Sequence, residues 1–527
     1  MKKVFKYQVF FTLFISGVNS FGQSFVPLTS DYSRVMEGWV LENNLNISTS
    51  VKPLSIHSLN EFVNSDSLFS FEVKKPEILK NWIVRKLFYE NFLIADTTDF
   101  KIAIDPLFNL QYEKDAQSGI TWLNNTRGIR IFGSLGNKIF FESNYFENQS
   151  TFPVYLTDYI NSSIVIPGQG YTGQGIIRDF NGKSFDYSSA SGMLHYRYGR
   201  HFEFSAGHGK LFIGDGYRSL FLSDNSFNYP HFRITANYGK IQYTRIMAIL
   251  MGDYIQTGYI EAREKKLAGF NVLNYLPFYW LHVMFFEGNI WRYPNVNKNI
   301  NFDFNYLNPV IYINSVLSNV NCKSLGGMGL KLNLLKAVQF YGQVAMDKIP
   351  SGSNSGNHFA WQAGAKYFNV FNFKNLYFQA EYNESQNGTY VYNPQILDYS
   401  HLNQALAHPL GTNFSELVLI AHYNYKRLQF NGKWNFSNYG LSSVQVPNKK
   451  TKYYSDYPFA TPFIGVGPFT ELKFADYKIA YLLNPKTNLK IEAGYTSRNA
   501  IVDGINFNQG FVYISFISFL ENWYYDF

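Results

Sequence analysis

The stretch LVLIAHYNYKRLQFNGKWNF, residues 417 to 436, decides the fold class of this chain. On either side of Lys426-Arg427 its residues alternate with a period of two, so that apolar and aromatic residues form one face and amides and charges much of the other. Successive side chains of a β-strand point to opposite faces, and apolar-out, polar-in alternation is typical of transmembrane β-barrels. We therefore expect an antiparallel hairpin in which Trp434 and Phe436 face lipid while Lys433 and Asn435 face the lumen.

The same alternation recurs along the chain, in residues 194–206, 361–367, 376–382 and 489–496. A soluble β-sandwich also alternates, but here aromatic residues gather at the strand ends, as in the girdles of membrane barrels. The predicted fold is all-β, a large antiparallel transmembrane β-barrel over residues 98–527 with about 16 to 18 strands. The aromatic-rich residues 516–527 resemble an apolar last strand with a terminal aromatic, which is how barrel-assembly signals look.

The N-terminus predicts export. Lys2, Lys3 and Lys6 precede an apolar run at residues 9–18 that is too short to span a bilayer, and Ser20-Phe21-Gly22 follows it. These features predict a signal peptide over residues 1–22, with cleavage after Gly22.

Residues 23–97 predict a small helical periplasmic region. Pro76 is placed as at a helix start, and Leu79, Trp82, Ile83 and Leu87 share one helical face. We expect this region to form a lid packed on the barrel rim; the alternative is a docking or plugging element.

Composition excludes other membrane architectures. Aromatic residues make up 19% of the chain and charged residues 16%, against roughly 25% charged in soluble proteins. Beyond the signal peptide no window of apolar residues is long enough for a membrane helix, and a closed barrel is the other structure that spans bilayers. We therefore predict an outer-membrane location.

The charge pattern bears on partners. The formal net charge of +8 is spread along the chain rather than clustered. This argues against nucleic acid and is compatible with lipopolysaccharide or acidic glycans. We expect outer-membrane lipid, lipopolysaccharide and surface polysaccharide or gliding-machinery proteins as partners. Cys322, the single cysteine, cannot form an intramolecular disulfide.

Two segments exceed what a hairpin needs: residues 207–231, and the Asn- and Tyr-rich residues 386–412. Long loops in a barrel fold into the lumen or form the outer surface. The first segment carries the candidate site residues Lys210, Asp215, Arg218 and Asp224. We expect it to fold inward and occlude the barrel, with Arg218 paired to Asp215 or Asp224 across a turn that Gly214 and Gly216 permit. A structured constriction and a ligand contact both remain open as its role.

Catalysis is not expected. The ten histidines are scattered, and neither a His-Glu-x-x-His motif nor a Gly-x-Ser-x-Gly elbow occurs. An outer-membrane hydrolase would have to use His201, His208 and His231 with Asp215 and Ser219. We predict no catalytic residue, no metal and no cofactor.

The segment Gly214-Asp215-Gly216-Tyr217-Arg218-Ser219-Leu220, followed by Leu222-Ser223-Asp224-Asn225 and Tyr229-Pro230, resembles the central motif of the Wzi-like capsule assembly family. Within that family it is most similar to the RemB-type gliding-motility members. Residues 49–53 and 522–527 look similar too. The resemblance implies an outer-membrane barrel with a helical bundle on the periplasmic side, which organises surface polysaccharide or supports movement over surfaces.

Three hypotheses follow: a non-enzymatic surface-organisation protein in gliding motility or capsule attachment, an outer-membrane solute channel or transporter, and an outer-membrane enzyme. A channel needs an open lumen, whereas a surface-organisation protein does not.

Overall fold

The structure is a computed structural model that describes residues 25–56, 59, 68–69, 81–163, 165–171, 177–179, 183–252, 264–317, 321–347, 358–392, 395–440, 469–518 and 520–527. The predicted signal peptide, Pro76 and Leu79 lie outside the described residues.

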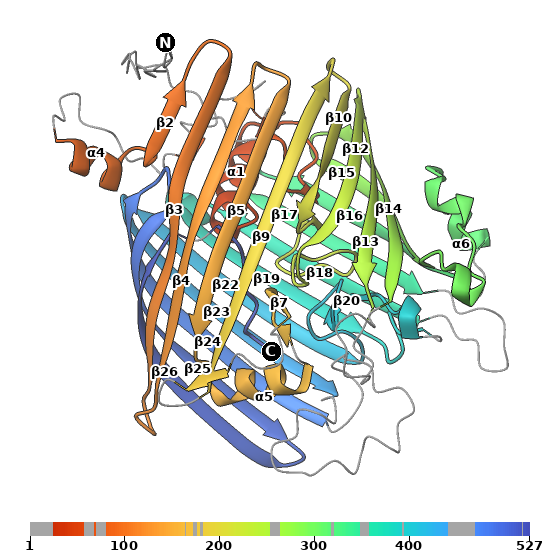
Figure 1. Cartoon of the computed structure of the whole chain (residues 1–527). Coiled ribbons are helices and arrows are strands. Elements are labelled where there is room, and N and C mark those ends of the chain that lie inside the picture. The colour runs from red at the N-terminus through yellow and green to blue at the C-terminus, as the bar shows by residue number, and fades with distance from the viewer. Residues whose placement is uncertain are drawn as a thin grey trace, which may run out of the picture.

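Eighteen antiparallel strands form a closed ring (Figure 1), because the last strand, β26, pairs with the first, β3. This agrees with the predicted fold class and strand number. In ring order the strands are β3 (Phe100–Asp115), β4 (Thr121–Leu135), β5 (Ile139–Ser150), β9 (Lys183–Tyr198), β10 (Phe202–Gly209), β12 (Tyr229–Tyr238), β13 (Ile241–Met251), β14 (Lys265–Phe278), β15 (Leu281–Arg292), β16 (Cys322–Leu334), β17 (Val338–Asp347), β18 (His358–Phe368), β19 (Leu376–Ser385), β22 (Phe414–Tyr425), β23 (Leu428–Gly440), β24 (Phe469–Asn484), β25 (Leu489–Val502) and β26 (Ile505–Ile517).

The remaining helices, strands and turns are not part of the ring of eighteen strands. They are the helices α1 (Ser30–Glu42), α4 (Trp82–Phe88), α5 (Val154–Ser163) and α6 (Ile313–Leu317), the short strands β1 (Val51–Lys52), β2 (Leu93–Asp96), β6 (Val165–Ile166), β7 (Gly170–Tyr171), β8 (Ile177–Asp179), β11 (Phe212–Ile213), β20 (Ser400–His401) and β21 (Gln404–Ala405), and the 3-10 turns η2 (Val296–Lys298), η3 (Phe304–Leu307), η4 (Val370–Asn372) and η5 (Gln395–Leu397).

The alternation of the sequence determines which side chains face inward. In the hairpin of β22 and β23, Asn435 is fully buried and Phe436 is exposed, and the register pairs Trp434 with Leu419. Lys433 and Asn435 both contact Asp526 inside the barrel. The predicted orientation of this hairpin is therefore confirmed.

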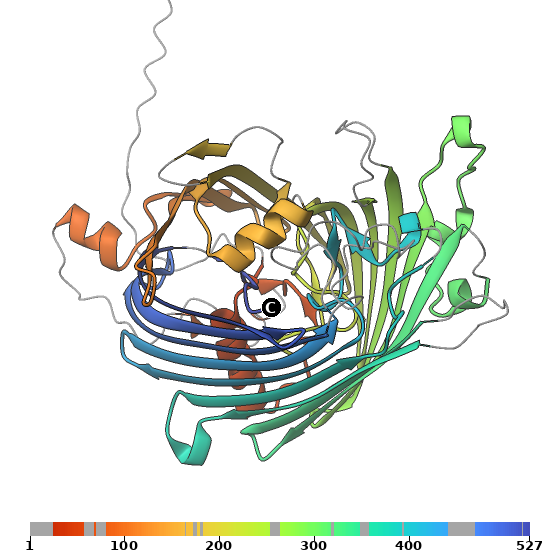
Figure 2. The same ribbon diagram turned by 90° about the horizontal axis from the view of Figure 1, so that it is seen from below.

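The two ends of the barrel differ in their connections. At one end, the short-turn end, the strands are joined by tight turns such as Gly136-Asn137-Lys138 and Lys426-Arg427. Gly136 and Lys426 have positive φ there, a backbone conformation typical of hairpin turns of two or three residues. At the other end, the long-loop end, β5, β15, β19 and β23 are followed by long connections, and α5 crosses the opening (Figure 2).

The N-terminal residues lie deeper than expected. Figure 1 shows α1 within the barrel, where Glu37 binds Lys366 of β18. Residues 25–56 are thus inside the barrel rather than a lid on its rim. The helix expected near Trp82 and Ile83 is α4, which lies outside the ring (Figure 1) and exposes the side chains of Trp82, Ile83 and Leu87. The boundary of the helical region at residue 97 stays a prediction.

The end of the chain also differs from the expectation. Strand β26 ends at Ile517, so the last residues are not part of the final strand. They run through the lumen from the short-turn end to α5. The side chain of Asn522 accepts a hydrogen bond from the backbone amide of Ser30 in α1. Further along, the Tyr525 carbonyl accepts from the Tyr155 hydroxyl of α5, and the Phe527 and Tyr159 rings lie 5.0 Å apart. Inward amides and charges attract this segment, and a terminal aromatic alone does not distinguish a strand end from a lumen segment.

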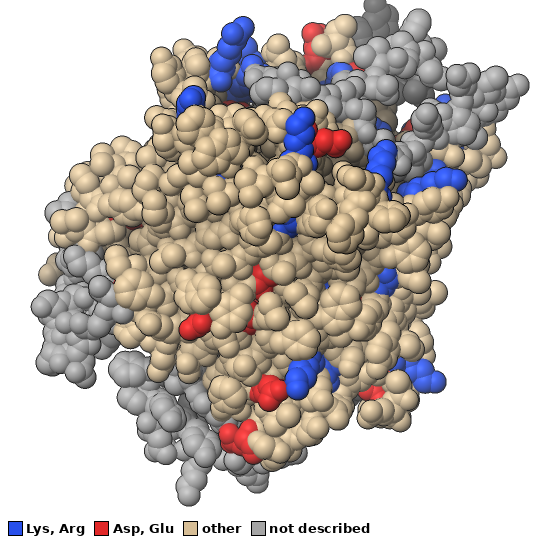
Figure 3. Space-filling model, turned by 180° about the vertical axis from the view of Figure 1, so that it is seen from behind, with Lys and Arg blue, Asp and Glu red and all other residues tan. Residues whose placement is uncertain are grey.

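One face of the outer wall is shown in Figure 3. Charged side chains gather toward its two ends and leave a broad, mostly uncharged band between them. Such a band suits contact with hydrocarbon. Among the described residues, no helix is long and apolar enough to cross a membrane.

The orientation of β24 gives a test. In a Cys322→Ala background, Lys478→Cys should react with a water-soluble maleimide and Ile479→Cys should not, because Lys478 lines a lumen cavity while Ile479 lies on the outer face. Labelling is measured in the folded protein in vesicles, with both variants unfolded as controls. The opposite reactivity would mean that the register of β24 is wrong.

Candidate functional site

Three segments far apart in the sequence meet inside the barrel. They are the N-terminal segment (residues 25–56), the inward loop (residues 210–228, between β10 and β12) and the C-terminal tail (residues 520–527). We call them together the lumen plug. The segment expected to fold inward therefore does so, although its first and last residues belong to β10 and β12.

The inward loop has an apolar tip. Leu220, Phe221 and Leu222 are completely buried, and the Phe221 ring stacks on Phe286 of β15 with centroids 4.5 Å apart. A Cβ at Gly327 of β16 would lie 2.2 Å from the Phe221 ring, so only glycine allows this approach. The lumen here holds a packed hydrophobic core, unlike the polar interior of an open porin.

The second long loop packs on the first. The hydroxyl of Tyr390 donates to the carbonyl of Leu220 at 2.9 Å, and that of Tyr399 donates to the carbonyl of Phe221 at 2.6 Å. These bonds satisfy two main-chain carbonyls that would otherwise be buried without a partner. The loop around residues 386–412 therefore belongs to the interior as well.

Arg218 connects the inward loop to the opposite wall. Its guanidinium forms a fork with Glu416 of β22, with Nη2 at 2.9 Å from Oε1 and Nε at 3.2 Å from Oε2, and Nη2 also lies 3.1 Å from Asp526. Strand β22 lies half-way round the ring from β10. The side chains of Arg218 and Glu416 are 1% and 0% exposed. Bidentate pairs are among the strongest hydrogen bonds in proteins, so this contact fixes the loop across the lumen.

Asp526 joins the C-terminal tail to this pair. Its carboxylate accepts from Lys433 at 2.8 Å, from the Tyr217 hydroxyl at 2.9 Å and from Asn435 at 3.0 Å. Burial alone would raise the pKa of the Asp526 carboxyl, but Arg218 and Lys433 outweigh burial and hold this pKa well below its usual range. The tail is thus bound as an anion between two cations.

Gly216 lets the loop approach β19. The backbone amides of Tyr217 and Arg218 donate to Glu381 at 2.6 and 2.9 Å. A Cβ at position 216 would lie 2.4 Å from the same carboxylate. Glycine is therefore required at position 216 because a larger residue would collide with Glu381. We had expected a different reason, a tight turn that pairs Asp215 with Arg218.

Asp215 connects the loop to the N-terminal segment. Its carboxylate lies 2.8 Å from Lys331 of β16 and accepts from Ser50 at 2.8 Å. Nearby, β1 pairs antiparallel with β11, so residues 51–52 and 212–213 form a small sheet within the lumen. The two sequence segments that resemble the Wzi-like family, near residues 49–53 and 214–230, are thus brought together.

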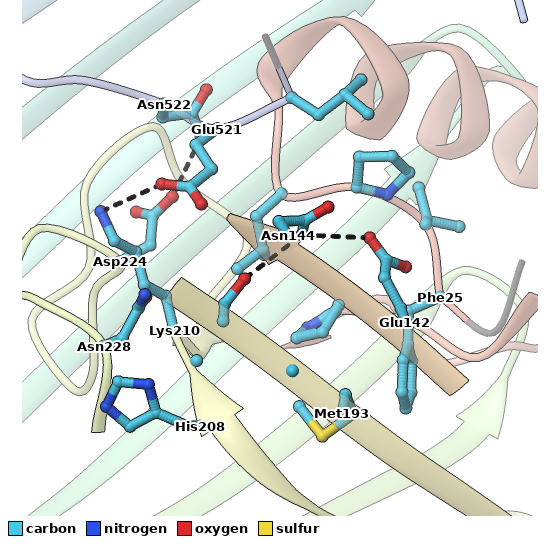
Figure 4. Close-up of a pocket in the computed structure, with 18 of the residues that line it drawn as sticks. Phe25, Glu142, Asn144, Met193, His208, Lys210, Asp224, Asn228, Glu521 and Asn522 are labelled. Carbon is cyan, nitrogen blue, oxygen red and sulfur yellow. Dashed lines mark hydrogen bonds and ion pairs between the residues drawn. The ribbon is translucent and has the colours of Figure 1, made fainter. Parts of the chain in front are cut away.

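Asp224 and Lys210 contact the tail. Asp224 accepts from Tyr524 at 2.7 Å and from Asn522 at 3.1 Å, while Lys210 lies 3.7 Å from Glu521. Figure 4 shows Lys210, Asp224, Glu521 and Asn522 around a cavity of about 110 Å³, which is bounded on its other side by residues of β5 such as Asn144. Burial raises the pKa of Asp224, and Lys210 offsets this only in part. The cavity has room for a few water molecules.

All four predicted residues are therefore buried in the plug, but not with the partners we expected. Arg218 pairs with Glu416 and Asp526, so its predicted pairing with Asp215 or Asp224 is wrong. Lys210, Arg218 and Asp224 contact the tail, and Asp215 contacts the N-terminal segment. A ligand role for the four residues stays a prediction.

Sequence reasoning missed the partners. Glu416 lies on the inward-facing side of the alternating strand β22, so its position in the lumen was predictable. No feature of the neighbouring sequence identifies it as the partner of Arg218. Asp526 was missed because residues 516–527 had been assigned to a strand. His408 lies 2.7 Å from Glu416 and was equally hidden in a loop.

The histidines considered for hydrolysis contact main-chain atoms. His208 lies 3.1 Å from the carbonyl of Ala190, His231 lies 3.1 Å from that of Tyr229, and Ser219 donates to the carbonyl of Ile213. Within the described ranges, no group of three or more His, Cys, Asp or Glu side chains is placed to hold a metal ion.

A second cavity of about 80 Å³ lies at the long-loop end, beneath α5. Tyr155 and Tyr159 of α5 line it with Arg498 of β25 and Gln509 of β26, and the Arg498 guanidinium lies 4.4 Å from the centre of the Tyr155 ring. The tail reaches this cavity, because Arg498 donates to a main-chain oxygen of Phe527. The plug thus runs from one end of the barrel to the other.

Comparison with known proteins supports the architecture. No family model matches the chain, and no curated protein sequence matches it. A solved structure that it resembles is that of Wzi from Escherichia coli, described as an outer-membrane protein involved in group 1 capsule assembly and as a carbohydrate-binding β-barrel. The TM-score is 0.53 at 13% identity, over 94% of this chain and 99% of Wzi. This chain is an outer-membrane β-barrel.

Weaker likenesses are found to outer-membrane proteins of Pseudomonas aeruginosa. OprD aligns with a TM-score of 0.43 at 11% identity, over 82% of this chain and 99% of OprD. OpdK, solved with vanillate, aligns with a TM-score of 0.44 at 8% identity, over 79% and 98%. Neither bears on function.

In outer-membrane barrels short turns face the periplasm, so the long-loop end of this barrel is extracellular.

Arg218→Ala tests the plug. The substitution leaves two buried carboxylates without their shared cation, a loss of about 3–5 kcal/mol in buried pairs. Ion conductance in planar bilayers should rise above that of the unaltered protein, while heat-modifiable migration of the barrel stays the same. Arg200→Ala, in an exposed short turn, is the matched control. Unchanged conductance in Arg218→Ala would show that Arg218 does not hold the plug.

Proposed function

We propose that this chain is a non-conducting, non-enzymatic outer-membrane barrel that organises polysaccharide at the cell surface. The observation that carries the proposal is the lumen plug, in which buried ion pairs tie three segments to opposite walls of the barrel. A solute channel needs a continuous polar path, whereas an interior packed in this way makes the barrel a rigid support for its extracellular end.

The extracellular end offers groups that suit sugars. Beneath α5, the side chains of Tyr155 and Tyr159 line a cavity together with Asp158, Arg498 and Gln509. Aromatic side chains combined with neighbouring hydrogen-bonding groups suit the apolar ring faces and the hydroxyls of a sugar. The description of Wzi as carbohydrate-binding supports this assignment by analogy of fold.

A contribution to gliding is the second part of the proposal. The resemblance of residues 214–230 to RemB-type members supports it, and a polysaccharide held at the surface is also a means of adhesion to a substratum. Motility and capsule attachment would then use the same extracellular surface.

The proposal is tested on purified protein. Polysaccharide extracted from the surface of the producing cells should bind the protein in detergent, measured by calorimetry. Asp158→Ala combined with Gln509→Ala should weaken binding roughly tenfold, because each removes a hydrogen-bonding group worth about 0.5–1.5 kcal/mol. Asn137→Ala, in a turn at the opposite end of the barrel, should not change it.

A deletion strain separates the biological roles. Loss of cell-bound polysaccharide, with or without loss of spreading, is the expected result. Retention of polysaccharide in the deletion strain, together with porin-like conductance of the purified protein, would reject the proposal in favour of a channel.

A further inference from the structure

The connection between β15 and β16 lies on the outside of the barrel. Figure 2 shows α6, which belongs to this connection, beyond the wall on the side of β14 to β16. Residues 293–317, which we call the outer flap, contact the outward side chains of β13 to β16. This is unusual, because that face of a membrane barrel is ordinarily left to lipid.

The wall beneath the flap is polar at membrane depth. Ile246, Val272 and Phe286 belong to the interior core, so their neighbours Arg245, Asn271 and Glu287 face outward. Arg245 is near the middle of β13, an 11-residue strand, which is the length that spans the hydrocarbon of a bilayer. Charged residues at this depth on a lipid-facing wall are destabilising.

These outward groups form a chain of hydrogen bonds. Arg245 donates from Nη1 to the Asn271 oxygen at 2.9 Å, and the Asn271 amide donates to Glu287 at 3.0 Å. All three residues are at most 4% exposed. The opposite charges of Arg245 and Glu287 are thus linked through one amide, which lowers the energy of burying both.

The flap completes this chain. The backbone amide and hydroxyl of Ser315 in α6 donate to Glu287 at 2.9 and 3.0 Å, and Arg245 donates to the carbonyl of Tyr306. Tyr312 donates to the carbonyl of Gly327 at 2.7 Å. The inner side of the flap therefore satisfies the polar groups of the wall and separates them from the membrane.

The outer side of the flap is apolar. Phe304 and Val316 are 78% and 75% exposed, and Leu307 and Val310 are exposed as well. Residues 304–317 carry no charged side chain. On β16 next to the flap, Met328 and Leu330 are also exposed, so the flap continues the apolar surface of the barrel.

We propose that the outer flap is a lipid-contact surface embedded in the outer leaflet of the outer membrane. Its polar side seals the Arg245, Asn271 and Glu287 chain, and its apolar side contacts acyl chains. Continuity with the apolar wall and the absence of charge in residues 304–317 favour hydrocarbon over a polar protein partner. The inference rests on the outer-membrane location and is independent of polysaccharide binding.

Quenching of a fluorescent label locates the flap. In a Cys322→Ala background, Phe304→Cys and Val316→Cys are labelled with a thiol-reactive fluorophore, and the whole chain is reconstituted in vesicles that contain tail-brominated phosphatidylcholine. Met328→Cys on the outer wall is the control for lipid, and Leu335→Cys, 89% exposed in a short turn, is the control for water. Heat-modifiable migration confirms that each variant is folded.

The labels at positions 304 and 316 should be quenched by brominated tails as strongly as the label at 328, and several-fold less by aqueous iodide than the label at 335. Quenching by iodide to the extent seen at 335 would place the flap in water and overturn the proposal. Protection from both quenchers would mean that another copy of the chain covers the flap, which would overturn lipid as its occupant.

Discussion

The fork between Arg218 and the carboxylates of Glu416 and Asp526 is the contact on which the interior of this barrel depends. One guanidinium joins the inward loop, the wall at β22 and the C-terminal tail at a single buried point. Removing charges from water is costly unless they are paired and bonded. Here Lys433 adds a second cation, so two positive and two negative groups meet. The balance of charge allows a tail that carries a carboxylate to lie inside the barrel.

The other contacts of the plug are arranged around this contact of Arg218 with Glu416 and Asp526. The inward loop can cross the lumen because Gly216 admits the Glu381 carboxylate, and its apolar tip then reaches Phe286. The N-terminal segment attaches to the same loop through Asp215 and the pairing of β1 with β11. The barrel is thus organised from the inside as well as by its ring of strands.

Local pattern was enough to predict the wall, because the period of two in segments such as 417–436 reports directly which side each residue faces. The inward position of residues 210–228 was also predictable from length and glycine content. The partners were not. Arg218 pairs with Glu416, which is 198 positions away in the sequence. A pairing between residues so far apart cannot be recognised from the local pattern of a single sequence. The C-terminal residues were assigned to a strand because their aromatic content fits either a strand end or a packed lumen segment.

The position of the tail is the most direct test of this account. In a Cys322→Ala background, Tyr525→Cys is exposed to a polyethylene-glycol maleimide, which is too large to enter a plugged barrel, and labelling is followed as a mobility shift. If the tail lies in the lumen, the folded protein resists labelling and only the unfolded protein reacts. Labelling of folded Tyr525→Cys as fast as that of Leu335→Cys in an exposed turn would contradict the account, because the tail would then lie outside the barrel.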